Sequence, residues 1–96
     1  MTKDFIQYVR STMTESIKIN VPETERDYET GNGVGCWALV DADTKRRYDA
    51  DEERSDDVYL AVLDSDINLY GLRVGDLILI EMRGKNRPVY VRPYTA

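Results

Sequence analysis

The residues of this sequence that could carry out chemistry are few. Histidine, the usual proton acceptor at neutral pH, does not occur among the 96 residues. Cys36 is the only cysteine, which rules out an intrachain disulfide and a zinc site built from several thiolates. Without a histidine to act as its base, we expect Cys36 to be a small buried apolar residue. The residue types therefore predict a protein that is not an enzyme, with no catalytic residues.

Two segments have part of the spacing of a ligand-binding loop. Asp64-Ser65-Asp66-Ile67-Asn68 begins like a calcium loop, which needs a glycine at its sixth position and a glutamate at its twelfth. This chain has Leu69 and Gly75 there, so we expect an acidic turn between strands and no metal. The glycine-rich stretch 31–35 lacks the lysine and the following helix of a phosphate loop. We therefore predict no bound cofactor.

Charge is unevenly distributed along the chain. The net charge is −5, and residues 22–57 hold twelve acidic side chains against five basic ones. Binding to nucleic acid or to an anionic membrane needs a basic surface, so we predict neither partner. The longest apolar run, residues 58–63, is far shorter than the ~20 residues that span a bilayer, and no secretory signal pattern begins the chain. We expect the protein to be soluble in the cytoplasm.

An N-terminal helix is predicted by the apolar residues Phe5, Val9 and Met13, which lie four positions apart. The pattern favours a helix from Thr2 to Met13, with Thr2 as its N-cap. A helix this short is marginally stable in isolation, so it must dock on the rest of the chain or on a partner.

Strands are predicted for most of the remaining chain. Six segments have the alternation or the apolar runs of short strands: 17–21, 34–40, 46–48, 58–63, 77–82 and 87–92. Residues 34–40 are apolar on both faces and predict a buried strand, whereas 41–45 and 74–76 predict turns. Residues 49–57 are too highly charged to be buried and predict a solvated loop. Pro88 and Pro93 place the last strand at a sheet edge, with Val89 and Val91 facing the core.

These elements predict a mainly β fold: a small β-barrel or sandwich of about six short strands with a short N-terminal helix or arm. The length fits one domain. Within it we distinguish the helix or arm with the first strand (1–21), an acidic loop (22–33) and a β-rich body (34–96).

Seven tyrosines in a chain of this size favour a protein-binding surface, because tyrosine combines apolar area with a hydrogen-bonding group. Candidate partner-binding residues are the exposed aromatic and basic side chains of the arm, the last hairpin and the edge strand. They are Phe5, Tyr8, Arg83, Arg87, Tyr90 and Arg92.

The order of motifs in residues 34–92 resembles the capsid decoration (cement) proteins of tailed phages. These motifs are Ala38-Leu-Val-Asp41, Arg47-Tyr48-Asp49, Val58-Tyr-Leu-Ala-Val-Leu63 and Val74-Gly-Asp-Leu-Ile-Leu-Ile-Glu-Met-Arg-Gly84. The chain departs from the family pattern at Ala61, where a glycine is customary, and in its high charge. The resemblance implies a non-enzymatic structural virion protein on the capsid surface that binds between capsid subunits. It further implies a dimer or trimer whose partner is the major capsid protein.

Two other functions are compatible with the sequence. The acidic segment 22–57 could mimic the charge of nucleic acid in a small phage-type inhibitor. An OB-like or SH3-like binding module could use the hairpin Arg83–Arg92, with Tyr90 as a stacking surface, although the net charge opposes it.

Overall fold

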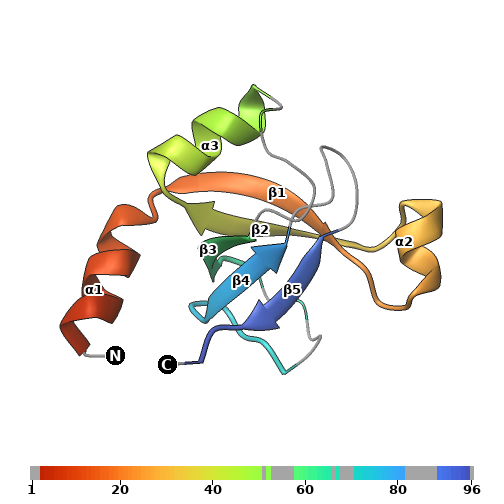
Figure 1. The fold of residues 1–96 in the computed structure, drawn as a ribbon. Coiled ribbons are helices and arrows are strands. Elements are labelled where there is room, and N and C mark those ends of the chain that lie inside the picture. The colour runs from red at the N-terminus through yellow and green to blue at the C-terminus, as the bar shows by residue number, and fades with distance from the viewer. Residues whose placement is uncertain are drawn as a thin grey trace.

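Five antiparallel strands form one sheet in the computed structural model, which describes residues 3–50, 52, 58–65, 67, 71–81 and 89–95 (Figure 1). The strands follow one another in sequence order across the sheet. They are β1 (Glu15–Val21), β2 (Val34–Val40), β3 (Val58–Leu63), β4 (Leu77–Glu81) and β5 (Tyr90–Pro93). The mainly β fold predicted from the sequence is therefore confirmed, as one open sheet and not as a closed barrel.

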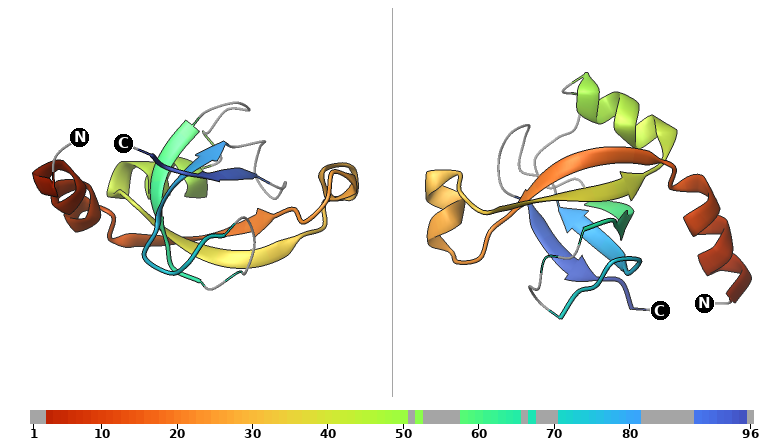
Figure 2. Two further views of the ribbon diagram at one scale, coloured as in Figure 1. Left: turned by 90° about the horizontal axis from the view of Figure 1, so that it is seen from below. Right: turned by 180° about the vertical axis from the view of Figure 1, so that it is seen from behind.

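Three helices accompany the sheet in the described part of the chain. The N-terminal helix α1 (Lys3–Thr12) leads into β1, and the short α2 (Arg26–Thr30) lies in the connection between β1 and β2. Helix α3 (Ala42–Asp49) follows β2 and lies against β1. Helices α1 and α2 project at opposite ends of the molecule in every view (Figures 1 and 2). None of these helices is long and apolar enough to span a membrane.

The sheet bends where β2 meets β3. Strands β1 and β2 are paired along their whole length, from Glu15 opposite Val40 to Val21 opposite Val34. Strand β2 contacts β3 through only two registered pairs, Ala38 with Leu63 and Leu39 with Val62. This short junction lets β3, β4 and β5 turn back toward β1. The sheet therefore wraps around its own inner face.

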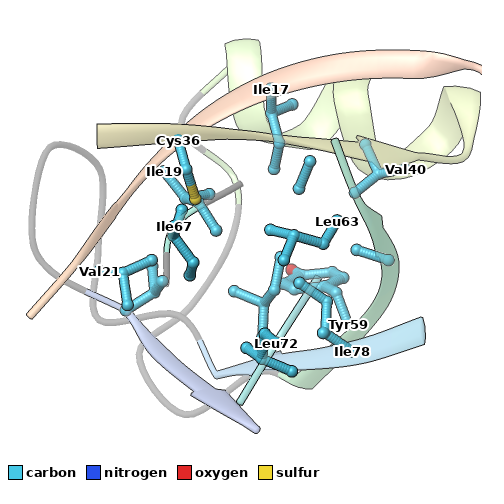
Figure 3. Close-up of a cluster of buried hydrophobic side chains, with 14 residues drawn as sticks. Ile17, Ile19, Val21, Cys36, Val40, Tyr59, Leu63, Ile67, Leu72 and Ile78 are labelled. Atoms are coloured by element: carbon cyan, nitrogen blue, oxygen red, sulfur yellow. The ribbon is translucent and has the colours of Figure 1, made fainter. Parts of the chain in front are cut away.

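The inner face of the sheet carries the main core (Figure 3). Alternate residues of β1 to β4 point into it, joined by side chains from the loop after β3 and from Val89. Its buried members are Ile17, Ile19, Val21, Cys36, Ala38, Val40, Tyr59, Ala61, Leu63, Ile67, Leu72, Ile78, Ile80 and Val89. This inner core is apolar apart from the Tyr59 hydroxyl and the Cys36 thiol, so its stability comes mainly from the hydrophobic effect.

A second, smaller core lies on the outer face. Val9 of α1 and Met13, the residue directly after the helix, are buried there against Val62 of β3 and Leu77 of β4. The partly buried side chains of Leu39, Leu60 and Tyr94 surround this contact. The C-terminal half of α1 therefore docks on its own sheet, as an amphipathic helix must if it is to be stable.

The two edge strands approach each other at one point. The backbone N–H of Val89, just before β5, donates to the carbonyl of Asn20 in β1 at 2.9 Å. Two residues earlier in β1, the Lys18 carbonyl accepts a 2.9 Å hydrogen bond from the Tyr48 hydroxyl of α3. These contacts satisfy backbone groups along the outer edge of β1, which would otherwise invite pairing with another chain.

Helix α3 occupies Ala42–Asp49, and the prediction of a turn at 41–45 followed by a short return strand was wrong. Asp41 is the N-cap of α3, and its carboxylate accepts a 2.7 Å hydrogen bond from the Thr44 N–H. Lys45 and Asp49, four residues apart, form a 2.9 Å ion pair along the helix. Capping and i,i+4 pairing favour a helix over the turn that the aspartates suggested. Helix α2 is likewise an element that the sequence analysis treated as loop.

Other predicted boundaries agree closely with the structure. The strands predicted at 34–40 and 58–63 have those bounds, and the predicted N-terminal helix corresponds to α1. Pro93 lies in the edge strand β5, with Val89 buried and Tyr90 exposed as the alternation indicated. Thr2 and Pro88, together with most of the segment 49–57, lie outside the described residues.

Candidate protein-binding surface

Helix α1 has one anchored half and one projecting half. Val9 and Met13 are buried in the outer-face core, whereas Phe5 is 41% exposed and Tyr8 is 67% exposed. Phe5 lies one turn before Val9 on the same apolar stripe. The helix leads away from the sheet toward the N-terminus (Figure 1). The structure therefore presents both predicted arm residues to solvent from an element that is held in place by its other end.

A hollow of about 420 Å³ lies beside the C-terminal edge of the sheet. Six residues of β3, β4 and β5 line it: Val58, Leu79, Glu81, Tyr90, Val91 and Arg92. Val58 is 50% exposed and Tyr90 is 39% exposed, so apolar area faces solvent here. The predicted residues Tyr90 and Arg92 thus lie together, whereas Arg83 and Arg87 fall outside the described residues.

The arm and this edge belong to the same outer face of the sheet. Tyr94, which follows β5, packs against the cluster that holds Val9 and Met13. The N- and C-terminal ends lie near each other in Figure 1 and in both views of Figure 2. The predicted binding residues come from both ends of the chain, and the tertiary structure brings these two ends together.

The hollow contains two opposite charges that do not pair with each other. In the β4–β5 register, Glu81 is opposite Tyr90 and Leu79 is opposite Arg92. Glu81 and Arg92 therefore occupy diagonal corners of a square, and Leu79 and Tyr90 occupy the other two. Neither charged side chain forms an ion pair or a hydrogen bond with the residues that the structure describes. The surface is consequently apolar along one diagonal and charged along the other.

Strand β5 has few backbone N–H and C=O groups free to pair with a strand from another chain. The Tyr94 N–H donates to the Leu77 carbonyl at 3.0 Å, so in an antiparallel ladder the backbone groups of Arg92 and Tyr90 also point toward β4. The groups of Val91 point the other way. On that outer edge the N–H of Val89 already bonds Asn20. Pro93 has no N–H at all. We therefore expect recognition at this edge to use side chains and not strand addition.

Trp37 is a surface aromatic residue that the sequence analysis missed. The strand 34–40 was predicted to be buried on both faces, but Trp37 is 48% exposed on the outer face of β2. It lies opposite Lys18, whose exposed side chain projects from the polar face of β1. In β1 the polar residues Ser16, Lys18 and Asn20 alternate with apolar ones, which places them on the outer face. Because Trp37 pairs with Lys18, the pairing of the two strands places Trp37 on that same face.

The acidic segment 22–57 does not form one continuous surface in the described residues. Glu23, Glu25 and Glu29 are exposed around α2, at the far end of the β1–β2 hairpin. The acids around α3 are paired instead, with Asp43 and Glu52 both bound to Arg46 at 3.2 and 3.0 Å. The hydrogen bonds to Asp43 and then Glu52 raise the pKa of the Arg46 guanidinium. The described acids of the segment are therefore divided between two separate parts of the molecule, and Asp51, Glu53, Asp56 and Asp57 lie outside the described residues.

Cys36 lies in the inner core, where its thiol is removed from solvent. Burial raises the pKa of this thiol to about 11, because the charged thiolate is poorly solvated in an apolar environment. At neutral pH the thiol is therefore protonated and inert as a nucleophile. Within the described parts of the chain, no three acidic or cysteine side chains gather in a way that could hold a metal ion.

Comparison of the chain with protein-family models, curated proteins and solved structures finds no match. The resemblance to phage decoration proteins therefore rests on the short motifs of residues 34–92, and the surface described above is the basis for a functional proposal.

Proposed function

We propose that this chain is a non-enzymatic structural protein that attaches to a protein shell, as a capsid decoration (cement) protein of a tailed phage. Its partner is the major capsid protein, and it stabilises the shell on the virion surface by binding between capsid subunits. The observation that carries the proposal is the division of α1 into a buried half and a projecting aromatic half.

An anchored helix suits adhesion for an energetic reason. Burial of Val9 and Met13 against the sheet keeps the helix folded before any partner arrives. Binding then costs less conformational entropy than the ordering of a free peptide would. Phe5 and Tyr8 supply the large aromatic contacts that carry much of the affinity in protein interfaces. The motifs of residues 34–92 add the resemblance to decoration proteins, which act by such adhesion.

Charge placement is consistent with one face toward a shell and another toward solvent. The exposed acids of α2 lie at the end of the molecule opposite α1. A shell contact through α1 would keep these carboxylates in water, where they cost no desolvation energy. It would also leave them outside the interface, so they would not need basic partners on the shell.

Co-sedimentation tests the proposal. Shells assembled from the major capsid protein of the same genome are mixed with the purified chain and pelleted. We expect the wild type to pellet with the shells and the double variant Phe5→Ser, Tyr8→Ser to remain in the supernatant. Val74→Ser is the matched control, because Val74 is an exposed apolar residue that is not on α1.

Two results would overturn the proposal. Failure of the wild type to bind any such shell would refute the decoration function. Equal binding of the wild type and the α1 double variant, with both folded by circular dichroism, would show that α1 is not the contact.

A further inference from the structure

We propose that the outer-face hollow at β4 and β5 is a two-fold interface between two copies of this chain. The four residues at its centre form a self-complementary pattern, with Glu81 and Arg92 on one diagonal and Leu79 and Tyr90 on the other. This inference does not depend on the shell proposal, because it concerns the free protein in solution.

The pattern follows from the geometry of the two strands. Neighbouring strands are about 4.8 Å apart, and residues two positions apart on a strand are separated by roughly 6.8 Å. Glu81 and Arg92 are therefore about 8 Å apart at opposite corners, with no ion pair between them. Each charge is left for a group from outside the described chain.

A two-fold axis along the diagonal from Leu79 to Tyr90 gives both charged residues, Glu81 and Arg92, an oppositely charged partner in the second copy. Rotation about a line from Leu79 to Tyr90 places Glu81 of each copy opposite Arg92 of the other, and it places the two Tyr90 side chains near the axis. The axis makes an angle of roughly 35° with the strands, so the two sheets cross at about 70°, close to the orthogonal class of sheet packing. Such an isologous contact closes at two copies and does not propagate.

The remaining charges do not oppose this contact. Each copy carries a net charge of −5, but the exposed acids that the structure describes lie around α2 and α3, apart from Asp64 after β3, and none of them lines the hollow. Within the hollow, one acidic and one basic residue balance each other. Val58 and Tyr90 supply apolar area that two copies would remove from water. Side-chain packing is also the mode of contact that remains, because Val89 and Pro93 leave β5 a poor edge for strand addition.

The interface is tested by reversing the charge at Glu81 or at Arg92 and then mixing the two variants. We expect analytical ultracentrifugation at low salt to show the wild type with twice the mass of one chain as concentration rises. Glu81→Arg gives two positive corners and Arg92→Glu gives two negative ones, so each variant should dimerise at least tenfold more weakly. An equimolar mixture of the two variants should form a heterodimer, because positive corners then meet negative ones.

Charge reversals at α2 serve as controls, and cysteine cross-linking provides a second measurement of the interface. Glu25→Arg and Arg26→Glu change the net charge by the same amounts at α2, and both should dimerise like the wild type. Tyr90→Cys should be joined into a covalent dimer by a short bismaleimide, whereas Val74→Cys should not. The α1 double variant Phe5→Ser, Tyr8→Ser should still dimerise, which separates this interface from the shell contact.

Three outcomes would refute the interface. They are a monomeric wild type at all concentrations, single variants that dimerise as strongly as the wild type, and a mixture that stays monomeric while both variants are folded. Success of the mixing experiment together with failure of shell binding would keep the dimer and remove the decoration function.

Discussion

The two faces of the same sheet differ in how completely they are covered. The inner face is closed over by the bend of the sheet, and its alternate residues from four strands are buried together. The outer face is covered only where α1 crosses Val62 and Leu77, and it exposes Trp37, Val58 and Tyr90 elsewhere. Burial of one face is enough to fold a small domain. The uncovered part of the other face is therefore available for binding, and the following predictions test this contrast.

The largest effect is expected from truncation on the inner face. Ile78 is fully buried in the centre of the core, and Ile78→Ala should lower the free energy of unfolding by about 3 to 4 kcal/mol. The next residue, Leu79, faces outward and is half-buried, so Leu79→Ala should cost only about 1 kcal/mol. Urea unfolding followed by Trp37 fluorescence measures both. Equal losses would show that the two faces do not differ in their contribution to stability.

The second prediction compares the buried C-terminal end of the α1 segment, Val9 to Met13, with its projecting N-terminal end. Met13→Ala removes a buried side chain from the outer-face core and should lower the free energy of unfolding by about 2 to 3 kcal/mol. Tyr8→Ser alters a mostly exposed side chain and should change it by less than about 0.5 kcal/mol. Thermal and urea unfolding compare the two variants. If Tyr8→Ser were as destabilising as Met13→Ala, the projecting half would be part of the core.

A pH titration examines the inner face in a different way. The Cys36 pKa is about 11 in the folded protein, above the value of 9.0 that the thiol has when it is exposed. Between these values the unfolded chain releases a proton that the folded chain keeps, so stability falls as pH rises. The loss should reach about 2 kcal/mol near pH 11. Cys36→Ala serves as the control, because the part of the slope that this thiol causes should disappear in it.

The smallest effect concerns the N-cap of α3, which lies beside the edge of the sheet. Asp41→Ala removes the carboxylate that accepts from the Thr44 N–H and should cost about 1 kcal/mol. Asp43→Ala, which removes an exposed partner of Arg46 in the same helix, should cost less. Urea unfolding of the two variants decides between them. The reverse order would mean that the surface ion pairs, and not the cap, hold α3.

Much of the local structure was predictable from the sequence because short-range patterns determine it. The alternation in residues 34–40 and the apolar run 58–63 predicted two strands with correct bounds, and the spacing of Phe5, Val9 and Met13 predicted α1. Helix α3 was missed because aspartate favours both turns and N-caps. Only the side-chain bond to Thr44 and the pairing of Lys45 with Asp49 distinguish the two outcomes.

The candidate surface was only partly predictable. The exposure of Tyr90 and Arg92 agrees with the strand alternation, whereas Phe5 is exposed although it shares the apolar stripe of Val9 and Met13. Trp37 was missed because a strand with apolar residues on both faces gives no sign of which face is covered. The roles of Val58, Leu79 and Glu81 could not be foreseen either, because they depend on the β3–β4–β5 register.

By itself, the sequence determined the type of most elements, the apolar side of each, and the lack of histidine and of a second cysteine. Composition and periodicity are properties of the chain, so no folding is needed to read them. Tertiary structure decided which apolar sides are covered and which charges become neighbours. Glu81 and Arg92 are eleven positions apart in the chain, and only the antiparallel register of β4 and β5 places them on one diagonal. Register depends on contacts between distant segments, and it is set when the whole inner face is buried together.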